Sequence, residues 1–93
     1  MKEEKIKMVV DNLKIELNEA NDGLCTVFEW DGQEYFADLC IVPTVNFTEC
    51  EIFESKDGQV TNWDELFRRR DIPVTEEQLK KCIEEFINEQ NED

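Results

Sequence analysis

Apolar and polar residues alternate along two neighbouring stretches of the chain, residues 24–30 and 33–42. An alternation with a period of two is typical of β-strands that are buried on one face. The dipeptide Asp31-Gly32 separates the two stretches, and Asp-Gly between apolar runs predicts a β-hairpin with a two-residue turn. Such a turn sets the register of the two strands, so we expect Phe28 to lie opposite Tyr35.

This register divides the hairpin into two faces. Most side chains on one face are large and apolar, so we expect that face to point into the core: Leu24, Phe28, Trp30, Tyr35, Leu39 and Ile41. The other face mixes carboxylates with thiols, apolar side chains and one aromatic ring: Cys25, Val27, Glu29, Glu34, Phe36, Asp38, Cys40 and Val42.

Additional strands are expected on both sides of the hairpin. Residues 12–18 alternate in polarity and predict a strand. Pro43 is expected to end the second strand of the hairpin, because proline cannot donate a ladder hydrogen bond. A third core strand is expected over 47–54, and after a turn at 55–58 a short strand is expected over 59–61.

The pattern predicts three helices. A short N-terminal helix is expected over 3–10, although apolar residues at helical spacing leave one longer helix through residue 18 as an alternative. A second short helix is expected over 63–70, where Asn62 can cap the first turn and residues 68–70, all arginine, suit the last turn.

The C-terminal helix has the clearest signals. Thr75 and Gln78 form a capping box, which marks the start of a helix. The apolar residues that follow keep helical spacing and predict one buried face: Leu79, Cys82, Ile83, Phe86 and Ile87. We expect this amphipathic helix to pack on the apolar face of the sheet.

The chain is therefore expected to form one α+β domain of 93 residues. Residues 1–11 form its N-terminal segment, 12–61 an antiparallel sheet and 62–90 two helices. The predicted sheet is a meander of three to four strands with the C-terminal helix on one face.

The acidic composition narrows the range of functions. Twenty-four acidic and 10 basic residues give a net charge of −14, which disfavours binding to nucleic acids or to anionic membranes and favours a basic partner. No apolar stretch is long enough for a membrane span or a secretion signal, so a cytoplasmic location is expected.

The residues also argue against catalysis and metal binding. The chain has no histidine, no glycine-rich phosphate loop and no calcium-loop pattern, so we expect neither enzymatic activity nor a cofactor. Its four cysteines show no C-x-x-C spacing, and we expect reduced, buried thiols and no metal site: Cys25, Cys40, Cys50 and Cys82.

Negative charge concentrates in the predicted sheet, since residues 24–62 hold eight acids and one base. The hairpin register sets Glu29 opposite Glu34 on the non-core face, and like charges in that position destabilise a sheet. When nearby residues do not compensate such a repulsive pair, the pair points to a functional role. We therefore predict a partner-binding surface of exposed carboxylates with one aromatic anchor: Glu29, Glu34, Asp38, Glu49, Glu51 and Phe36.

In size, charge, acidic meander and acidic last helix, the chain resembles small acidic proteins of phages and mobile elements, including anti-CRISPR proteins and other DNA mimics. The resemblance implies an inhibitor that occupies a basic nucleic-acid-binding surface of another protein. Carboxylates two positions apart on a strand lie about 6.6 Å apart, comparable to neighbouring phosphates. The alternative is a small cytosolic adaptor or homodimer that binds a protein by hydrophobic contact.

Overall fold

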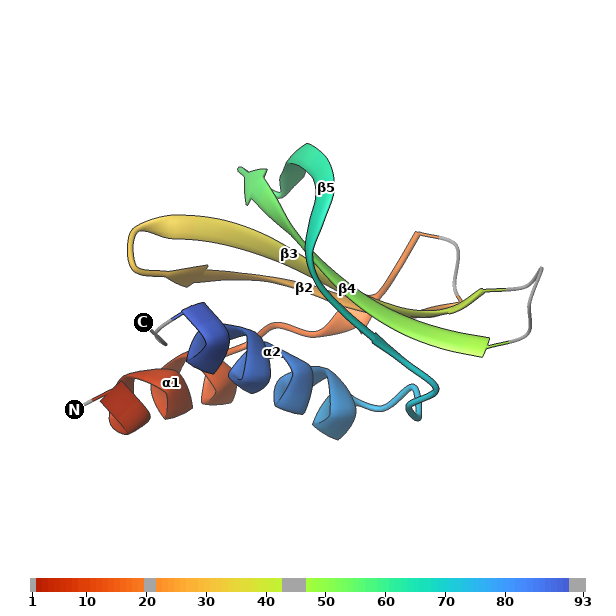
Figure 1. Ribbon diagram of the computed structural model, residues 1–93, viewed down its shortest axis with the longest axis horizontal. Helices are drawn as coiled ribbons and strands as arrows, with labels where there is room; N and C mark the ends of the chain where they lie inside the picture. Colours follow the sequence, from red (N-terminus) through yellow and green to blue (C-terminus); the bar gives the residue numbers. More distant parts are fainter. Residues whose placement is uncertain (1, 20–21, 43–46, 91–93) are drawn as a thin grey trace.

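The computed structural model describes residues 2–19, 22–42 and 47–90 (Figure 1). Its helices and strands are α1 Lys2–Asp11, β1 Glu16–Leu17, β2 Gly23–Trp30, β3 Gln33–Val42, β4 Phe47–Lys56, β5 Gln59–Arg70 and α2 Glu76–Gln90. The strands are antiparallel and lie in the order β1-β2-β3-β4-β5, so each pairs with its neighbour in the chain. The predicted α+β meander is confirmed, with five strands in the described residues where three to four were expected.

Two hairpins of the same kind organise the sheet. Asp31 and Gly32 both have positive φ, 52° and 81°, as the Asp-Gly signal requires, and Phe28 lies opposite Tyr35 as predicted. The turn between β4 and β5 repeats this geometry at Asp57 and Gly58, with φ of 53° and 82°. The expected longer turn over 55–58 is therefore only two residues long, and β4 continues to Lys56.

Both helices cover one face of the sheet, as Figure 1 shows, and the core lies between them and the strands. Phe86 of α2 is fully buried at its centre, with its ring 4.9 Å from that of Tyr35 and 6.1 Å from that of Phe28. All five apolar residues predicted for the buried face of α2 are buried. The helix begins as expected, because the backbone N–H of Gln78 donates to Oγ1 of Thr75 at 3.1 Å.

The predicted core face of the hairpin is confirmed except at one end. Leu24 and Trp30 are partly buried against the core, but Ile41 is 44% exposed. The reason is that the buried cluster extends along β3 only as far as Leu39.

The prediction of a helix over 63–70 was wrong, because this segment belongs to β5. A capping residue and favourable end charges suggested the helix, but pairing with β4 decides the structure, with Phe67 opposite Ile52 and Arg70 opposite Glu49. Phe67 then points into the core and packs edge-on against Phe86 with the ring centroids 6.3 Å apart. Residues 63–66 stand opposite the single residue Phe53, which makes a wide bulge in the strand.

The N-terminal segment agrees with the expectation of a short helix and differs from what was expected after it. The short helix is confirmed as α1, but it ends at Asp11, where the side chain of Asn12 donates to the carbonyl of Met8 at 2.7 Å, so a helix through residue 18 is excluded. The expected strand over 12–18 is reduced to Glu16–Leu17. Residues before it cross to β2, where Thr26 Oγ1 donates to the carbonyl of Lys14 at 2.8 Å. The predicted role of Pro43 lies outside the described residues.

Candidate functional site

The candidate site is the face of the sheet that α1 and α2 leave uncovered, called the outer face below. The register sets its side chains in rows across the strands. One row joins Val27, Phe36 and Phe53, and the next joins Cys25, Asp38 and Glu51. The predicted site residues therefore do come from one face, but their surroundings differ from the row of exposed charges that we expected.

Glu34 is a structural residue. It lies opposite Glu29 as predicted, but its carboxylate accepts hydrogen bonds from Ser55 Oγ at 2.6 Å and from the backbone N–H groups of Gly58 at 3.0 Å and Asp57 at 3.2 Å. The bond from Ser55 and those from the turn backbone hold the pKa of Glu34 below its usual value. The interpretation of an uncompensated pair was therefore wrong, because the β4–β5 turn compensates Glu34, while Glu29 is exposed.

Glu49 is not an exposed contact either. It is only 9% exposed, and its Oε1 lies 3.0 Å from Nε of Arg70 and 3.3 Å from Nε of Arg68. These arginines reach it from the adjacent strand β5, because their alternation directs both to the outer face. The arginine run was expected to close a helix. In the structure its side chains pair with acids, and Arg69 pairs on the other face with Glu85 of α2.

Glu51 is partly buried beside a second carboxyl group, that of Glu65. Burial, contact with Glu65 and the charge of Glu49 raise the pKa of Glu51 to about 8. Oε2 of Glu65 is buried and finds no hydrogen-bond donor among the described residues while Glu51 is ionised. We infer that a proton on Glu51 supplies that donor, so that the two carboxyl groups share a proton at neutral pH and present less charge than predicted.

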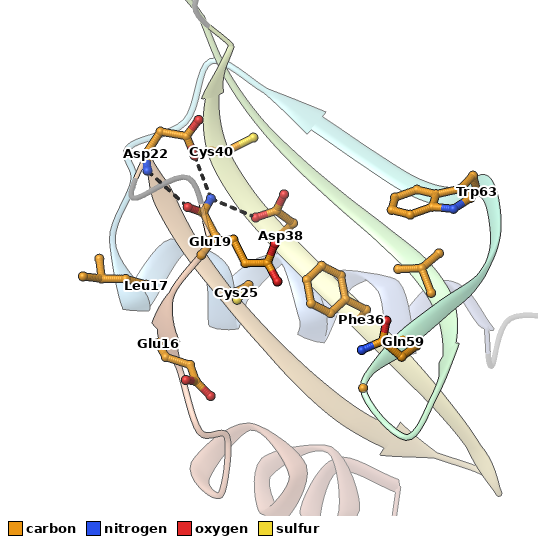
Figure 2. Close-up of a pocket in the computed structure, with 13 residues that line it drawn as sticks. Glu16, Leu17, Glu19, Asp22, Cys25, Phe36, Asp38, Cys40, Gln59 and Trp63 are labelled. Atoms are coloured by element: carbon orange, nitrogen blue, oxygen red, sulfur yellow. Dashed lines mark hydrogen bonds between the residues drawn. The ribbon is translucent and has the colours of Figure 1, made fainter.

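Asp38 lies at the centre of the outer face and is partly buried. Nδ2 of Asn18 donates to Asp38 at 3.3 Å and to Asp22 at 2.8 Å, so one amide links the two carboxylates. Burial raises the pKa of Asp38 despite the hydrogen bond from Asn18, which lowers it. Figure 2 shows Asp22 and Asp38, linked by the dashed hydrogen bonds, with Asp22 on the side of the pocket away from Trp63.

Phe36 lines a groove of about 620 Å³ on the outer face (Figure 2). The bulge in β5 carries Trp63 over Phe53, where the two rings meet edge to face with centroids 5.3 Å apart. The groove is lined by Glu16, Leu17, Asn18, Glu19, Asp22, Cys25, Phe36, Asp38, Cys40, Gly58, Gln59, Val60 and Trp63. Asp38 and Phe36 are thus the predicted site residues that the groove brings together.

Sequence reasoning missed most of the groove, because two irregular segments build it. Residues 16–19 frame one side, and β5 supplies Trp63 on the other. One signal was available: Trp63 is a large apolar residue in a charged segment whose strand character was not recognised. The N-terminal helix does not cover the outer face, because α1 packs beside α2 on the opposite face.

The thiols divide between the two faces. Cys50 and Cys82 are buried in the core, whereas Cys25 and Cys40 line the groove, where burial and the charge of Asp38 raise both their pKa values. Within the described ranges, no three side chains of cysteine, aspartate or glutamate are arranged to hold a metal ion.

The groove is a concave surface with an apolar side and an acidic side. Such an arrangement suits binding. Neither described helix is long and apolar enough to span a membrane. Comparison with protein-family models, with curated proteins and with solved structures finds no match to this chain.

Proposed function

We propose that this protein is a non-enzymatic, cytoplasmic binding protein that occupies a basic surface of another protein. The observation that carries the proposal is the charge of the groove. Among the described residues, four carboxylates line it, those of Glu16, Glu19, Asp22 and Asp38, with no lysine or arginine beside them. A basic partner would meet complementary charge there and would be steered toward it by the net charge of −14.

Two cations on the outer face support the same proposal. Arg68 and Arg70 lie on the outer face but are engaged by Glu49, and Arg68 also pairs with Glu65. These contacts hold the two arginines over β4, away from the carboxylates of the groove. Those carboxylates therefore remain unpaired by any cation among the described residues, which leaves their charge for a partner.

A narrower version is that the partner binds nucleic acid and that this protein inhibits it as a mimic. Size and negative charge support this version. Its contact residues must differ from those expected, because Glu49 is ion-paired and Glu51 shares a proton. The exposed carboxylates Glu16, Glu19 and Glu29 take their place in the proposal.

The test compares two charge-reversed variants. Glu16→Lys/Glu19→Lys changes the groove rim, and Glu84→Lys/Glu89→Lys makes the same change in net charge on exposed positions of α2. Each variant is immobilised, exposed to lysate of the source cell and washed at low and then high salt. The proposal expects a basic protein that the wild type and the α2 variant retain at low salt and release at high salt, and that the groove variant does not retain.

Equal retention by both variants would overturn the proposed surface, and equal loss would show that only net charge matters. Competition then tests the narrower version. If duplex DNA or structured RNA displaces this protein from the retained partner, the two share a surface and the mimic proposal stands. If neither competes, the partner is bound elsewhere and the mimic proposal fails.

A further inference from the structure

The groove has an apolar side that charge complementarity alone does not explain. Val60 and Trp63 of β5 form this side, Phe36 lies between them and the carboxylates, and Leu17 stands at the opposite edge (Figure 2). Trp63 is 75% exposed and Leu17 is 66% exposed. Large apolar side chains that gather at one exposed surface mark an interaction site, because each loses favourable burial while it remains in water.

Trp63 is held in place although the core does not need it. The wide bulge lifts it out of the ladder, its ring rests edge-on against Phe53, and the backbone N–H of Asp64 donates to Oδ1 of Asn62 at 3.0 Å. The local structure therefore presents the indole largely to solvent, with its ring in contact with Phe53. A pre-positioned tryptophan beside a groove is the residue type that most often dominates binding energy at protein interfaces.

The acidic side begins directly beside this apolar surface. Asp38 shares the groove with Phe36, and Asn18 ties Asp38 to Asp22. Glu16 and Glu19 are exposed on the adjoining edge. A ligand that fills the whole groove must therefore place an apolar group against Trp63 and Phe36 and cationic groups against the carboxylates on the other side of the groove.

The charge and the shape of the groove also limit the class of ligand that it can bind. A second copy of this chain has the same net charge of −14, and its three consecutive arginines are engaged by its own carboxylates. Nucleic acid is repelled by the four carboxylates. Trp63 and Leu17 project into solvent and do not enclose a cavity, so their contact area suits the surface of a macromolecule.

We propose that the groove binds a polypeptide segment in which one bulky apolar side chain is flanked by lysine or arginine. The apolar side chain packs between Trp63 and Phe36, and the cations lie against Glu16, Glu19 and Asp38. This inference rests on the proposed function. It adds a specific apolar anchor on the partner, which a partner surface that is only basic would lack.

Three synthetic peptides of equal length test the proposal on the full chain. The first has a central leucine with two lysines on each side, the second has alanine in place of leucine, and the third has glutamates in place of the lysines. Each is titrated into isotope-labelled protein, and amide chemical shifts are followed by NMR. We expect the leucine peptide to shift amides of groove residues, the alanine peptide to bind about 10-fold more weakly, and the glutamate peptide not to bind.

Variants assign the effect to the residues. Trp63→Ala should reduce the affinity for the leucine peptide to that of the alanine peptide, and should leave the alanine peptide unaffected. Glu16→Lys/Glu19→Lys should weaken both peptides. Met8→Ala is the matched control, because Met8 is 65% exposed on α1, on the opposite face of the molecule, and its removal should change neither affinity.

The outcomes separate this inference from the proposed function. If the leucine and alanine peptides bind equally and the rim variant weakens both, the anchor is overturned while a charge-driven binding function stands. If the shifted amides lie on α1 and α2 or do not saturate, the groove is not the site. A dimer in sedimentation equilibrium that Trp63→Ala dissociates would instead identify a second copy as the occupant and overturn the inference.

Discussion

At the scale of single residues, the acidic side chains on the outer face differ widely in role. Glu29 is exposed, Glu34 caps a turn, Glu49 is buried in an ion-pair cluster and Glu51 shares a proton with Glu65. Sequence alone places all of them on one face, because period-two alternation and the Asp-Gly turn determine the face. Sequence alone does not distinguish their roles, because each depends on a partner from another strand.

The proton shared by Glu51 predicts a pH dependence of stability. The folded-state pKa of Glu51 is about 8 against an ordinary 4.5, so its contribution is fully present below the unfolded-state pKa and is lost as pH rises through 8. Asp38 on β3, Glu49 on β4 and Glu65 and Arg68 on β5 surround it. We expect the free energy of unfolding to fall between pH 5 and pH 9 by about 1–3 kcal/mol from this group, since partial exposure reduces the full effect.

Glu51→Gln tests this dependence in urea unfolding at pH 5, 7 and 9. Glutamine keeps the shape and can donate to Oε2 of Glu65 at every pH, so the variant should lose less stability at pH 9 than the wild type. Glu29→Gln is the control at an exposed position. If the free energy of unfolding varies with pH in Glu51→Gln as it does in the wild type, the two carboxyl groups do not share a proton.

The turn role of Glu34 predicts a different pH window. Its pKa is lowered in the folded protein, so its contribution is present above the unfolded-state pKa and is lost as pH falls through the folded-state pKa. Glu34→Ala should therefore lower the thermal midpoint at pH 7 more than at pH 2.5. Glu29→Ala, at the position directly opposite, should have little effect. Equal midpoints of the two variants at pH 7 would contradict a capping role for Glu34.

At the scale of elements, the sequence predicted the structure correctly where that structure depends only on residues close by in the chain. The Asp31-Gly32 turn and the Thr75 cap depend on residues within a few positions, and both have the predicted geometry. The segment 63–70 carries contradictory signals, because its capping residue and end charges suit a helix while Arg68 and Arg70, two positions apart, suit a strand beside Glu49. Pairing with β4 decides between the two, and this pairing cannot be predicted from residues within the segment itself. The groove depends on this bulged strand, so it was missed together with it.

The packing of the core predicts how much the contact of α2 with the sheet contributes to the free energy of unfolding. Phe86 is fully buried and its ring contacts those of Phe28, Tyr35 and Phe67, so it joins α2 to three strands. Phe86→Ala should lower the free energy of unfolding by about 3–5 kcal/mol, because it removes apolar burial and leaves a cavity. Urea unfolding followed by circular dichroism measures the loss. Met8→Ala should change it by less than about 0.5 kcal/mol, and a similar small change at Phe86 would contradict the packing described here.

At the scale of the whole molecule, negative charge opposes folding. The radius of gyration is 12.7 Å, which is shorter than the Debye length of about 30 Å at 0.01 M salt. At that ionic strength the excess carboxylates on all faces repel one another across the domain. At 1 M salt the Debye length falls to about 3 Å, and only groups in contact still interact.

We therefore expect salt to stabilise this protein although it weakens partner binding. Between 0.01 M and 1 M sodium chloride at pH 7, the urea midpoint should rise, because relief of repulsion among 14 excess charges outweighs the weakening of exposed pairs such as Arg69–Glu85. Repeating the measurement near pH 4.2, the isoelectric point, provides the control, since the net charge there vanishes and the rise should largely disappear. A midpoint that falls with salt at pH 7 would mean that the arginine–carboxylate pairs of β5 hold the sheet together more strongly than the net charge pushes it apart. In that case the cluster of Glu49 with Arg68 and Arg70 would be a main source of stability. Removing that cluster would then reveal more about the outer face than changing the net charge.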